Sequence, residues 1–332
     1  MSDAARPSAA AAKLADERRV HRTAFFVMLA VLVLAPAVVY PVFMMKVMCF
    51  ALFACAFNLL LGFTGLLSFG HAAFFGTAGY AAGHAMKVWG FTPEVGLAFG
   101  MLTSAVIGWL VGSLAIRRQG IYFAMVTLAL AQMIYFFMLQ APFTGGEDGL
   151  QGVPRGKLLG VVDLSEDIVL YYFVVAVFAF GFWLIYRTIH SPFGQVLKAI
   201  RENEPRAISL GYDVDRYKLV AFILSAALSG LAGATKTLVL GFETLTDVHW
   251  HISGEVVLMT LLGGLGTVFG PVVGATVIVA LQNELADKVG SWVQVIMGAI
   301  FVICVLAFRR GIVGELAALL KGKSASSGGG GH

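Results

Sequence analysis

The chain has 332 residues, of which 59% are hydrophobic and only 13% are charged, and its formal net charge is +4. Such a composition is too apolar for a water-soluble protein with a polar surface, so that class is excluded. We expect an all-α polytopic transmembrane bundle of about 8–10 helices, each crossing the bilayer with roughly 20 apolar residues.

The N-terminal part of the chain is polar before it becomes apolar. Residues 1–23 are rich in alanine and end in a basic cluster, which predicts a disordered cytoplasmic extension. Ala24 to Val39 is the first apolar run. A basic flank before an apolar core is also a feature of cleaved signal peptides, but the hydrophobicity of the whole chain favours a retained first span.

A second span, Val42 to Leu61, runs directly into the glycine-rich segment Gly62 to Gly83. Glycine at this density lets backbones approach closely or lets a helix break inside the membrane, and both arrangements suit a substrate path. Polar groups inside a membrane are costly, so Thr64, Ser68 and His71 are candidates for that path. The alternative for His71 is a packing role, with a hydrogen bond to a neighbouring helix.

Two further spans follow. Val95 to Ile116 has a small residue at every fourth position, which predicts a helix packed tightly on a neighbour: Gly96, Gly100, Ser104, Gly108 and Gly112. Ile121 to Leu139 predicts the next span. Pro142 to Asp167 carries five acidic and two basic residues and predicts an external loop.

A polar segment then separates two long apolar runs. Arg187 to Lys218 contains six Lys or Arg and four Asp or Glu, whereas Ile168 to Tyr186 and Leu219 to Thr235 contain no charge. The polar segment is therefore expected in water or at an interface. It is either a docking site for a partner or an amphipathic stretch that rests on lipid headgroups.

Two short helices are predicted inside this segment. One covers Phe193 to Glu202, and a second begins near Pro205 and can end at Gly211 as a left-handed cap residue. We refer to residues 190–213 as the coupling segment, after the role that the family resemblance given below implies for them.

The chain becomes apolar again from Leu219 to Leu240, where we expect Lys236 to snorkel towards the membrane surface. Gly254 to Asn283 is interrupted by glycines, and each half, at about 12 residues, is too short to cross a core about 30 Å thick. We expect a re-entrant pair of half-helices there, with two tilted spans as the alternative. Ser253 and Glu255, at its start, are further candidates for the path.

The interrupted regions resemble each other. Residues of one recur at nearly the same spacing in the other: Leu61-Gly62, Gly65 and Phe69-Gly70 against Leu262-Gly263, Gly266 and Phe269-Gly270. Either the two are paired breaks around a central path, or glycine-rich apolar segments resemble each other by chance.

The charge distribution completes the domain prediction. Trp292 to Phe308 is the last expected span, and residues 311–332 form a Ser/Gly-rich cytoplasmic tail. Basic residues place the N-terminus, Arg117-Arg118, the coupling segment and Arg309-Arg310 in the cytoplasm. Residues 24–310 then form one transmembrane domain.

No constellation for catalysis is present in the sequence. Gly322-Lys323-Ser324 lacks the upstream glycine of a phosphate loop, and His249 and His251 look like an incidental pair rather than a metal site. The three cysteines fall in apolar runs without metal-ligand spacing. We therefore expect no catalytic residue, cofactor or metal in this chain, and no nucleic-acid partner.

Five stretches together carry a family resemblance, and they reach across about two thirds of the chain: NLLLGFTGLLSFGHAAFFG from Asn58, YFAMVTLALAQM from Tyr122, FTGGEDGLQGV from Phe143, SPFGQVLKAIRENEPRAISLGYDV from Ser191 and LLGGLGTVFGPVVGA from Leu261. In this order they resemble the LivM-type permease of branched-chain amino acid ABC importers, an inner-membrane component of binding-protein-dependent transport. The resemblance implies a multi-pass subunit of the bacterial inner membrane that imports an amino acid.

The resemblance also implies partners: a related permease subunit that forms a heterodimer, two cytoplasmic ATPase subunits and a periplasmic substrate-binding protein. It gives the role of ATPase coupling to six residues: Glu202, Asn203, Glu204, Pro205, Arg206 and Ala207. Permeases for urea and other small amides share much of the pattern, so they are an alternative. An ion-coupled secondary transporter is a second alternative and a membrane-embedded enzyme a third, although no clustered catalytic set supports the enzyme.

Overall fold

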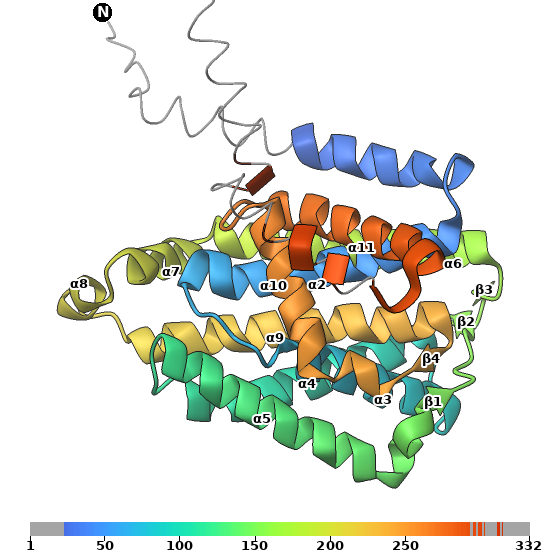
Figure 1. Ribbon diagram of the computed structural model, residues 1–332, viewed down its shortest axis with the longest axis horizontal. Coiled ribbons are helices and arrows are strands. Elements are labelled where there is room, and N and C mark those ends of the chain that lie inside the picture. Colours follow the sequence, from blue (N-terminus) through green and yellow to red (C-terminus); the bar gives the residue numbers. More distant parts are fainter. Residues whose placement is uncertain are drawn as a thin grey trace, which may run out of the picture.

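The computed structural model describes residues 23–292, 295–296, 298–300, 302, 311–312 and 314. Within these residues the chain is almost entirely helical, with four strands of two residues each (Figure 1). The predicted all-α class is thereby confirmed. Almost all of the predicted N-terminal extension and of the predicted C-terminal tail, and most of the last predicted span, lie outside the described residues.

The elements follow one another in this order. An apolar helix covers Thr23–Ala37 and ends in the 3-10 helix η1 (Ala35–Ala37). The α-helices after it are α2 (Pro41–Thr64), α3 (His71–Lys87), α4 (Pro93–Ala115), α5 (Ile121–Gln140), α6 (Asp167–Ile189), α7 (Pro192–Glu202), α8 (Glu204–Ser209), α9 (Val214–Leu240), α10 (Trp250–Gly263) and α11 (Gly270–Val289). The short elements are η2 (Pro142–Thr144), η3 (Gly146–Asp148), β1 (Leu150–Gln151), β2 (Lys157–Leu158), β3 (Val162–Asp163), β4 (Phe242–Glu243), η4 (Leu245–Asp247) and η5 (Gly290–Trp292).

Five of the described helices are long and apolar enough to cross a membrane: α2, α4, α5, α6 and α9. Each coincides with a predicted span to within a few residues. Pro41 and Pro93 occupy the first turns of α2 and α4, where a missing backbone N–H costs nothing because it would have no partner inside the helix. The chain is a multi-pass membrane protein.

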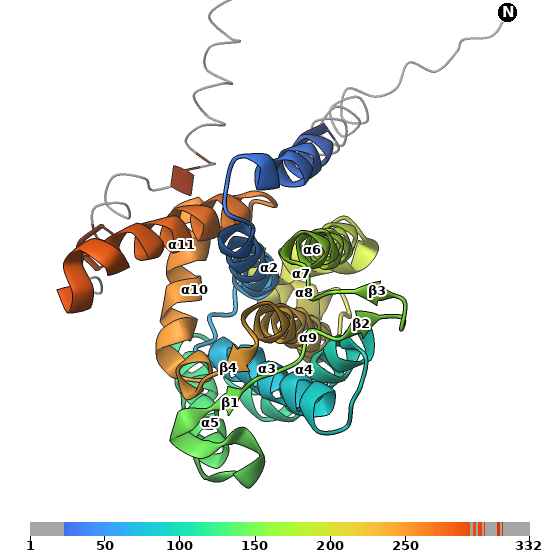
Figure 2. The ribbon, with the colours of Figure 1, turned by 90° about the vertical axis from the view of Figure 1, so that its right-hand side faces the viewer.

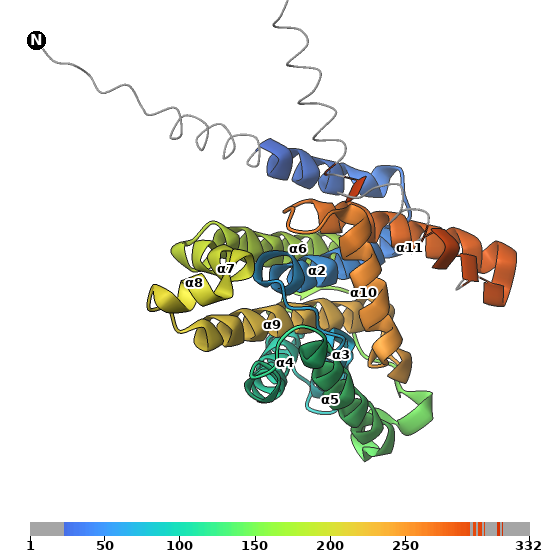
Figure 3. The same cartoon turned by 60° about the vertical axis from the view of Figure 1, so that its left-hand side comes forward.

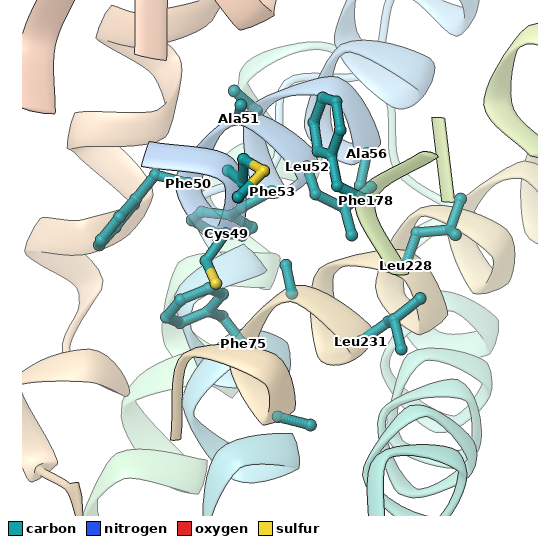
Figure 4. Close-up of a cluster of buried hydrophobic side chains, with 14 of the residues drawn as sticks. Cys49, Phe50, Ala51, Leu52, Phe53, Ala56, Phe75, Phe178, Leu228 and Leu231 are labelled. Carbon is teal, nitrogen blue, oxygen red and sulfur yellow. The ribbon is translucent and has the colours of Figure 1, made fainter. Parts of the chain in front are cut away.

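Helices α2 and α9 form the centre of the bundle, with α3, α4, α6 and α10 around them (Figure 2). Their core is apolar and largely aromatic. Figure 4 shows part of it, where Phe53 of α2 faces Phe75 of α3, with ring centroids 4.6 Å apart. Cys49 and Cys55 are free and buried among these side chains, as expected for packing residues.

Small residues set the distance between the helices. The predicted stripe on α4 is buried along its whole length, and it faces α3 and α9. A Cβ atom at Gly108 would lie 2.5 Å from Cβ of Ala226 in α9. Helices α3 and α9 approach each other still more closely, because a Cβ atom at Gly233 would lie 1.9 Å from the carbonyl oxygen of Phe75. Only glycine fits at Gly233 without moving one of the two helices.

The two ends of the bundle differ. Helices α7 and α8 project at one end (Figures 1 and 3), and the strand pair β1–β4 lies at the other (Figure 1). The turn between α4 and α5 lies at the α7–α8 end, because Gln119 Nε2 donates a hydrogen bond to Glu204 Oε1 at 3.0 Å. This agrees with the charge pattern, which places the turn and the coupling segment on one side of the membrane.

Helices α10 and α11 form a hairpin rather than two equal half-helices. They have 14 and 20 residues, so α11 is longer than the half-helix we expected and reaches about 30 Å. The break lies where the glycines and Pro271 predict it, between Gly263 and Gly270, and α11 is longer than expected because it continues through Gln282 and Asn283 to Val289. The helices pack closely, since a Cβ atom at Gly274 would lie 1.8 Å from the carbonyl oxygen of Met259.

Candidate functional site

The coupling segment folds as its capping signals predict. The Ser191 side chain accepts a hydrogen bond from Gly194 N at the start of α7, and the Asn203 side chain accepts one from Arg206 N at the start of α8. Gly211 follows α8 with a left-handed φ of +87°. These caps satisfy backbone groups that the short helices leave free, at about 1 kcal/mol per cap.

A small apolar cluster joins the two helices of the coupling segment. Ile200 of α7, Ala207 of α8 and Val214 of α9 are buried against one another. Ala207 therefore packs within the chain. Ile208 and Leu210, with exposed fractions of 58% and 69%, form the apolar surface that faces away from it.

The charged residues of the coupling segment play different roles. Glu204 Oε1 lies 2.7 Å from Nζ of Lys218, a nearly buried residue of α9, so Glu204 attaches α8 to the bundle. Glu202, Pro205 and Arg206 are exposed. Of the six predicted coupling residues, Asn203, Glu204 and Ala207 thus hold the segment in shape, and the exposed Glu202 and Arg206 give it a charged surface.

His71, at the first position of α3, joins two other helices inside the bundle. Its Nε2 lies 2.9 Å from Ser225 Oγ of α9, and that hydroxyl donates to the carbonyl oxygen of Ala56 at 2.6 Å. Because the single hydroxyl proton is used there, Nε2 of His71 is the donor to Ser225. The predicted hydrogen bond to a neighbouring helix is present. Nδ1 is a buried acceptor with no hydrogen-bond partner among the described residues.

Ser253 lies next to His71. Its Oγ accepts a hydrogen bond from Ala72 N at 2.9 Å, which satisfies one of the free N–H groups at the start of α3. The α2–α3 break and α10 therefore meet at this point. Two of the predicted path residues, His71 and Ser253, are brought together here.

The other predicted path residues lie apart from this pair. Thr64 Oγ1 donates to the carbonyl oxygen of Leu59, and Ser68 Oγ accepts from Gly70 N, so both satisfy the backbone of the α2–α3 break. Glu255 Oε1 lies 3.6 Å from His251 Nδ1 on α10. Two residues along a helix correspond to a rotation of about 200°, so Glu255 faces away from Ser253.

Asn58 of α2 was not singled out from the sequence. Its side chain donates to the carbonyl oxygen of Thr267 at 2.8 Å and accepts from Gly266 N at 3.1 Å, which clasps the turn between α10 and α11. Arg201 of α7 donates through Nη1 to the carbonyl oxygen of Gly62 at the same place. The sequence could have indicated a role for Asn58, because this strongly polar side chain lies in an otherwise apolar run.

Lys236 does not snorkel, which corrects the expectation from the sequence. Its exposed fraction is 4%, and its Nζ forms an ion pair with Asp247 Oδ2 and lies 3.5 Å from Glu243 Oε2. It also lies 5.9 Å from the centre of the Phe75 ring. The chain after α9 folds back over the end of the helix, so the lysine finds carboxylates inside the protein instead of water.

Lys236, Glu243 and Asp247 form a buried triad, in which one cation faces two carboxyl groups. Burial, together with the negative charge of Asp247, raises the pKa of Glu243 from 4.5 to about 8, although Lys236 opposes the shift. Glu243 therefore holds a proton at neutral pH, and Thr237 Oγ1 lies 2.5 Å from its Oε2. The triad fixes β4 and η4 at the end of the bundle opposite α7 and α8.

The sequence profile of the family described as "Branched-chain amino acid transport system / permease component" matches residues 41–305. The chain is similar to the high-affinity branched-chain amino acid transport system permease protein LivM of Salmonella typhimurium, with 26% identity over 300 residues that cover 83% of this chain and 70% of that protein. The LivM of Escherichia coli shows 25% identity over 289 residues, or 80% and 68%.

A second group of relatives matches a shorter part of the chain. The autoinducer 2 import system permease protein LsrC of Shigella flexneri is 26% identical over 221 residues, which cover 64% of this chain and 60% of that protein. No solved structure matches the chain.

Proposed function

Because the chain belongs to the family of branched-chain amino acid transport system permease components, we propose that it forms the translocation path of an ATP-driven importer for branched-chain amino acids. Membership of this family makes it a transport subunit rather than an enzyme. The proposed complex contains a related permease, two cytoplasmic ATPase subunits and a periplasmic binding protein. It lies in the bacterial inner membrane, with the N-terminus and the coupling segment in the cytoplasm.

The observation that carries the proposal is the coupling segment itself. Two capped helices project from one end of an apolar bundle, and they present the charged residues Glu202 and Arg206 beside the exposed Ile208 and Leu210. A preformed mixed surface of this kind suits a protein partner in water. A segment that rests on lipid would instead place its apolar residues on one continuous face.

The proposed path follows the region where the α2–α3 break meets α10. His71 and Ser253 lie there. Thr64 and Ser68 come before His71 on the same break, and Glu255 is proposed nearer the outer entrance. The apolar walls around His71 suit a branched aliphatic side chain, since the rings of Phe57, Phe74 and Phe222 surround it. The unpartnered Nδ1 of His71 is an acceptor suited to an ammonium group.

The substrate is tested by uptake of labelled leucine into proteoliposomes that contain the purified complex, its binding protein and internal ATP. Inhibition by excess isoleucine and valine, but not by urea, supports the proposal. The similarity to LsrC makes autoinducer 2 a second candidate. Uptake of autoinducer 2 without uptake of leucine would replace the proposed substrate and leave the permease function intact.

The docking role is tested by gentle purification and mass spectrometry of the proteins that remain bound. We expect Arg206→Glu to lose the ATPase subunits, because a reversed charge on the exposed surface opposes docking. Arg216→Glu is the control, since Arg216 is exposed and forms an ion pair with Asp213 three residues away. Equal recovery of the ATPase with Arg206→Glu would contradict the docking role. A wild-type chain that transports without ATP and stops when the ion gradient collapses would indicate a secondary transporter.

A further inference from the structure

The two breaks that resemble each other in sequence also share a left-handed glycine at corresponding positions. In the first, α2 ends at Thr64, Gly65 takes a left-handed φ of +78°, and α3 begins after Phe69-Gly70. In the second, α10 ends at Gly263, Gly266 has φ of +73°, and α11 begins after Phe269. The similarity is therefore structural as well as compositional.

Arg201, in the last turn of α7, lies between these two breaks. A Cβ atom on Gly65 would lie 3.2 Å from Arg201 Cγ, and one on Gly266 would lie 3.2 Å from Arg201 Nη1. Both left-handed glycines thus contact one side chain. The rest of that side chain is largely exposed at the end of the bundle.

The contact of Arg201 with α2 is polar and directional. Its Nη1 donates to the carbonyl oxygen of Gly62, one of the last four carbonyls of α2, which have no donor further along their own helix. A cation at this end also complements the helix dipole. Asn58, one turn earlier on α2, holds Gly266 and Thr267 of the second break.

We propose that Arg201 is the positioning residue through which movement of the coupling segment reaches both helix breaks at once. The inference depends on the proposed function, because it requires an ATPase that moves α7. When α7 shifts, the guanidinium carries the end of α2 with it through Gly62 and presses on the second break through Gly266. The Asn58 clasp keeps the two breaks together, so they move as one unit near His71 and Ser253.

The test compares Arg201→Gln, Arg201→Lys and Arg216→Gln in the complete complex reconstituted with its binding protein. With Arg201→Gln we expect wild-type recovery of ATPase subunits and wild-type basal ATP hydrolysis, but at least a tenfold loss of substrate transported per ATP. Arg201→Lys restores part of this ratio, because an ammonium group still donates to Gly62. Arg216→Gln retains the wild-type ratio.

A merely structural role for Arg201 predicts a different pattern: hydrolysis and uptake fall in proportion and the ratio stays constant. That result, or a wild-type ratio in Arg201→Gln, overturns the inference. A wild-type chain that recovers no ATPase is a failure of the proposed function and is recognised before any variant is made.

A second measurement needs no variant, and it tests the inference even if the Arg201→Gln chain does not assemble into the complex. Hydrogen exchange is followed in peptides covering residues 61–70 and 262–270 of the wild-type complex, with and without a non-hydrolysable ATP analogue. We expect both peptides to change exchange rate together. A change in neither, or in one alone, overturns the inference.

Discussion

Replacing Lys236 by methionine tests the buried triad directly. Methionine has a similar length and no charge, so the substitution removes the cation and leaves Glu243 and Asp247 in place. Both carboxyl groups are buried, with Glu243 fully inaccessible. The variant therefore separates the contribution of the charge from that of the volume.

The expected loss of stability follows from the burial of the ion pairs. Removing one partner of a buried pair leaves an uncompensated charge, at a cost of about 3–5 kcal/mol. For a chain of this size, such a loss lowers the melting temperature by on the order of 10 °C. The loss should be smaller at pH 5 than at pH 8, because Glu243, whose pKa is raised to about 8, is protonated and uncharged at pH 5.

The assay is thermal unfolding of the purified chain in detergent, followed by tryptophan fluorescence at one fixed scan rate, since membrane proteins often unfold irreversibly. Lys288→Met is the matched control. Lys288 and Glu284 lie 3.3 Å apart with side chains 73% and 69% exposed, and such pairs contribute little. A Lys236→Met variant that melts within about 2 °C of the control, a shift that corresponds to about 1 kcal/mol, would refute the reasoning.

Two further predictions concern neighbouring features. The raised pKa of Glu243 means that the folded chain retains a proton between pH 4.5 and about 8 that the unfolded chain has released, so wild-type stability falls as pH rises through this window. Glu243→Gln should flatten that profile, measured as melting temperature from pH 5 to pH 8; parallel profiles would contradict the assignment. Gly233→Ala should abolish folded protein in fluorescence-detected size-exclusion chromatography, whereas Gly254→Ala, with no atom within 4 Å of the added Cβ, should elute as wild type. Normal elution of both variants would show that α3 and α9 are further apart than described.

The sequence predicts the membrane-spanning helices well because the bilayer imposes a length and an apolar surface on each of them. The coupling segment is predicted for a different reason. Ser191, Asn203, Pro205 and Gly211 are local signals whose effects do not depend on the rest of the fold. Caps and turns are settled within a few residues, so they can be read directly from the chain.

Contacts between distant parts of the chain are not predicted in this way. Asn58 and Gly266 are 208 residues apart, and nothing near either one indicates the other. Lys236 is a different case, because its partners follow within 11 residues. The snorkelling rule considers only the position of a lysine along its helix. It therefore missed a loop that carries two acidic residues back over the helix end.

The length of α11 was also misjudged for a physical reason. The break before α11 was placed correctly, since Gly270 and Pro271 stand in the first turn of the helix, where proline is tolerated. Polar residues near Asn283 were read as the end of the helix. They do not end it, since glutamine and glutamate are good helix formers.

Helix α9 is held in place by a buried lysine near each of its ends. Lys218, paired with Glu204, and Lys236, paired with Asp247, are both buried and lie about 27 Å apart along this helix, close to the thickness of a bilayer core. In a thicker or thinner membrane α9 cannot slide without breaking one of these pairs. The adjustment must then come from tilting of α4, α5 and α6, whose outer faces are exposed, so lipid thickness should alter the rim of the bundle while its centre keeps its length.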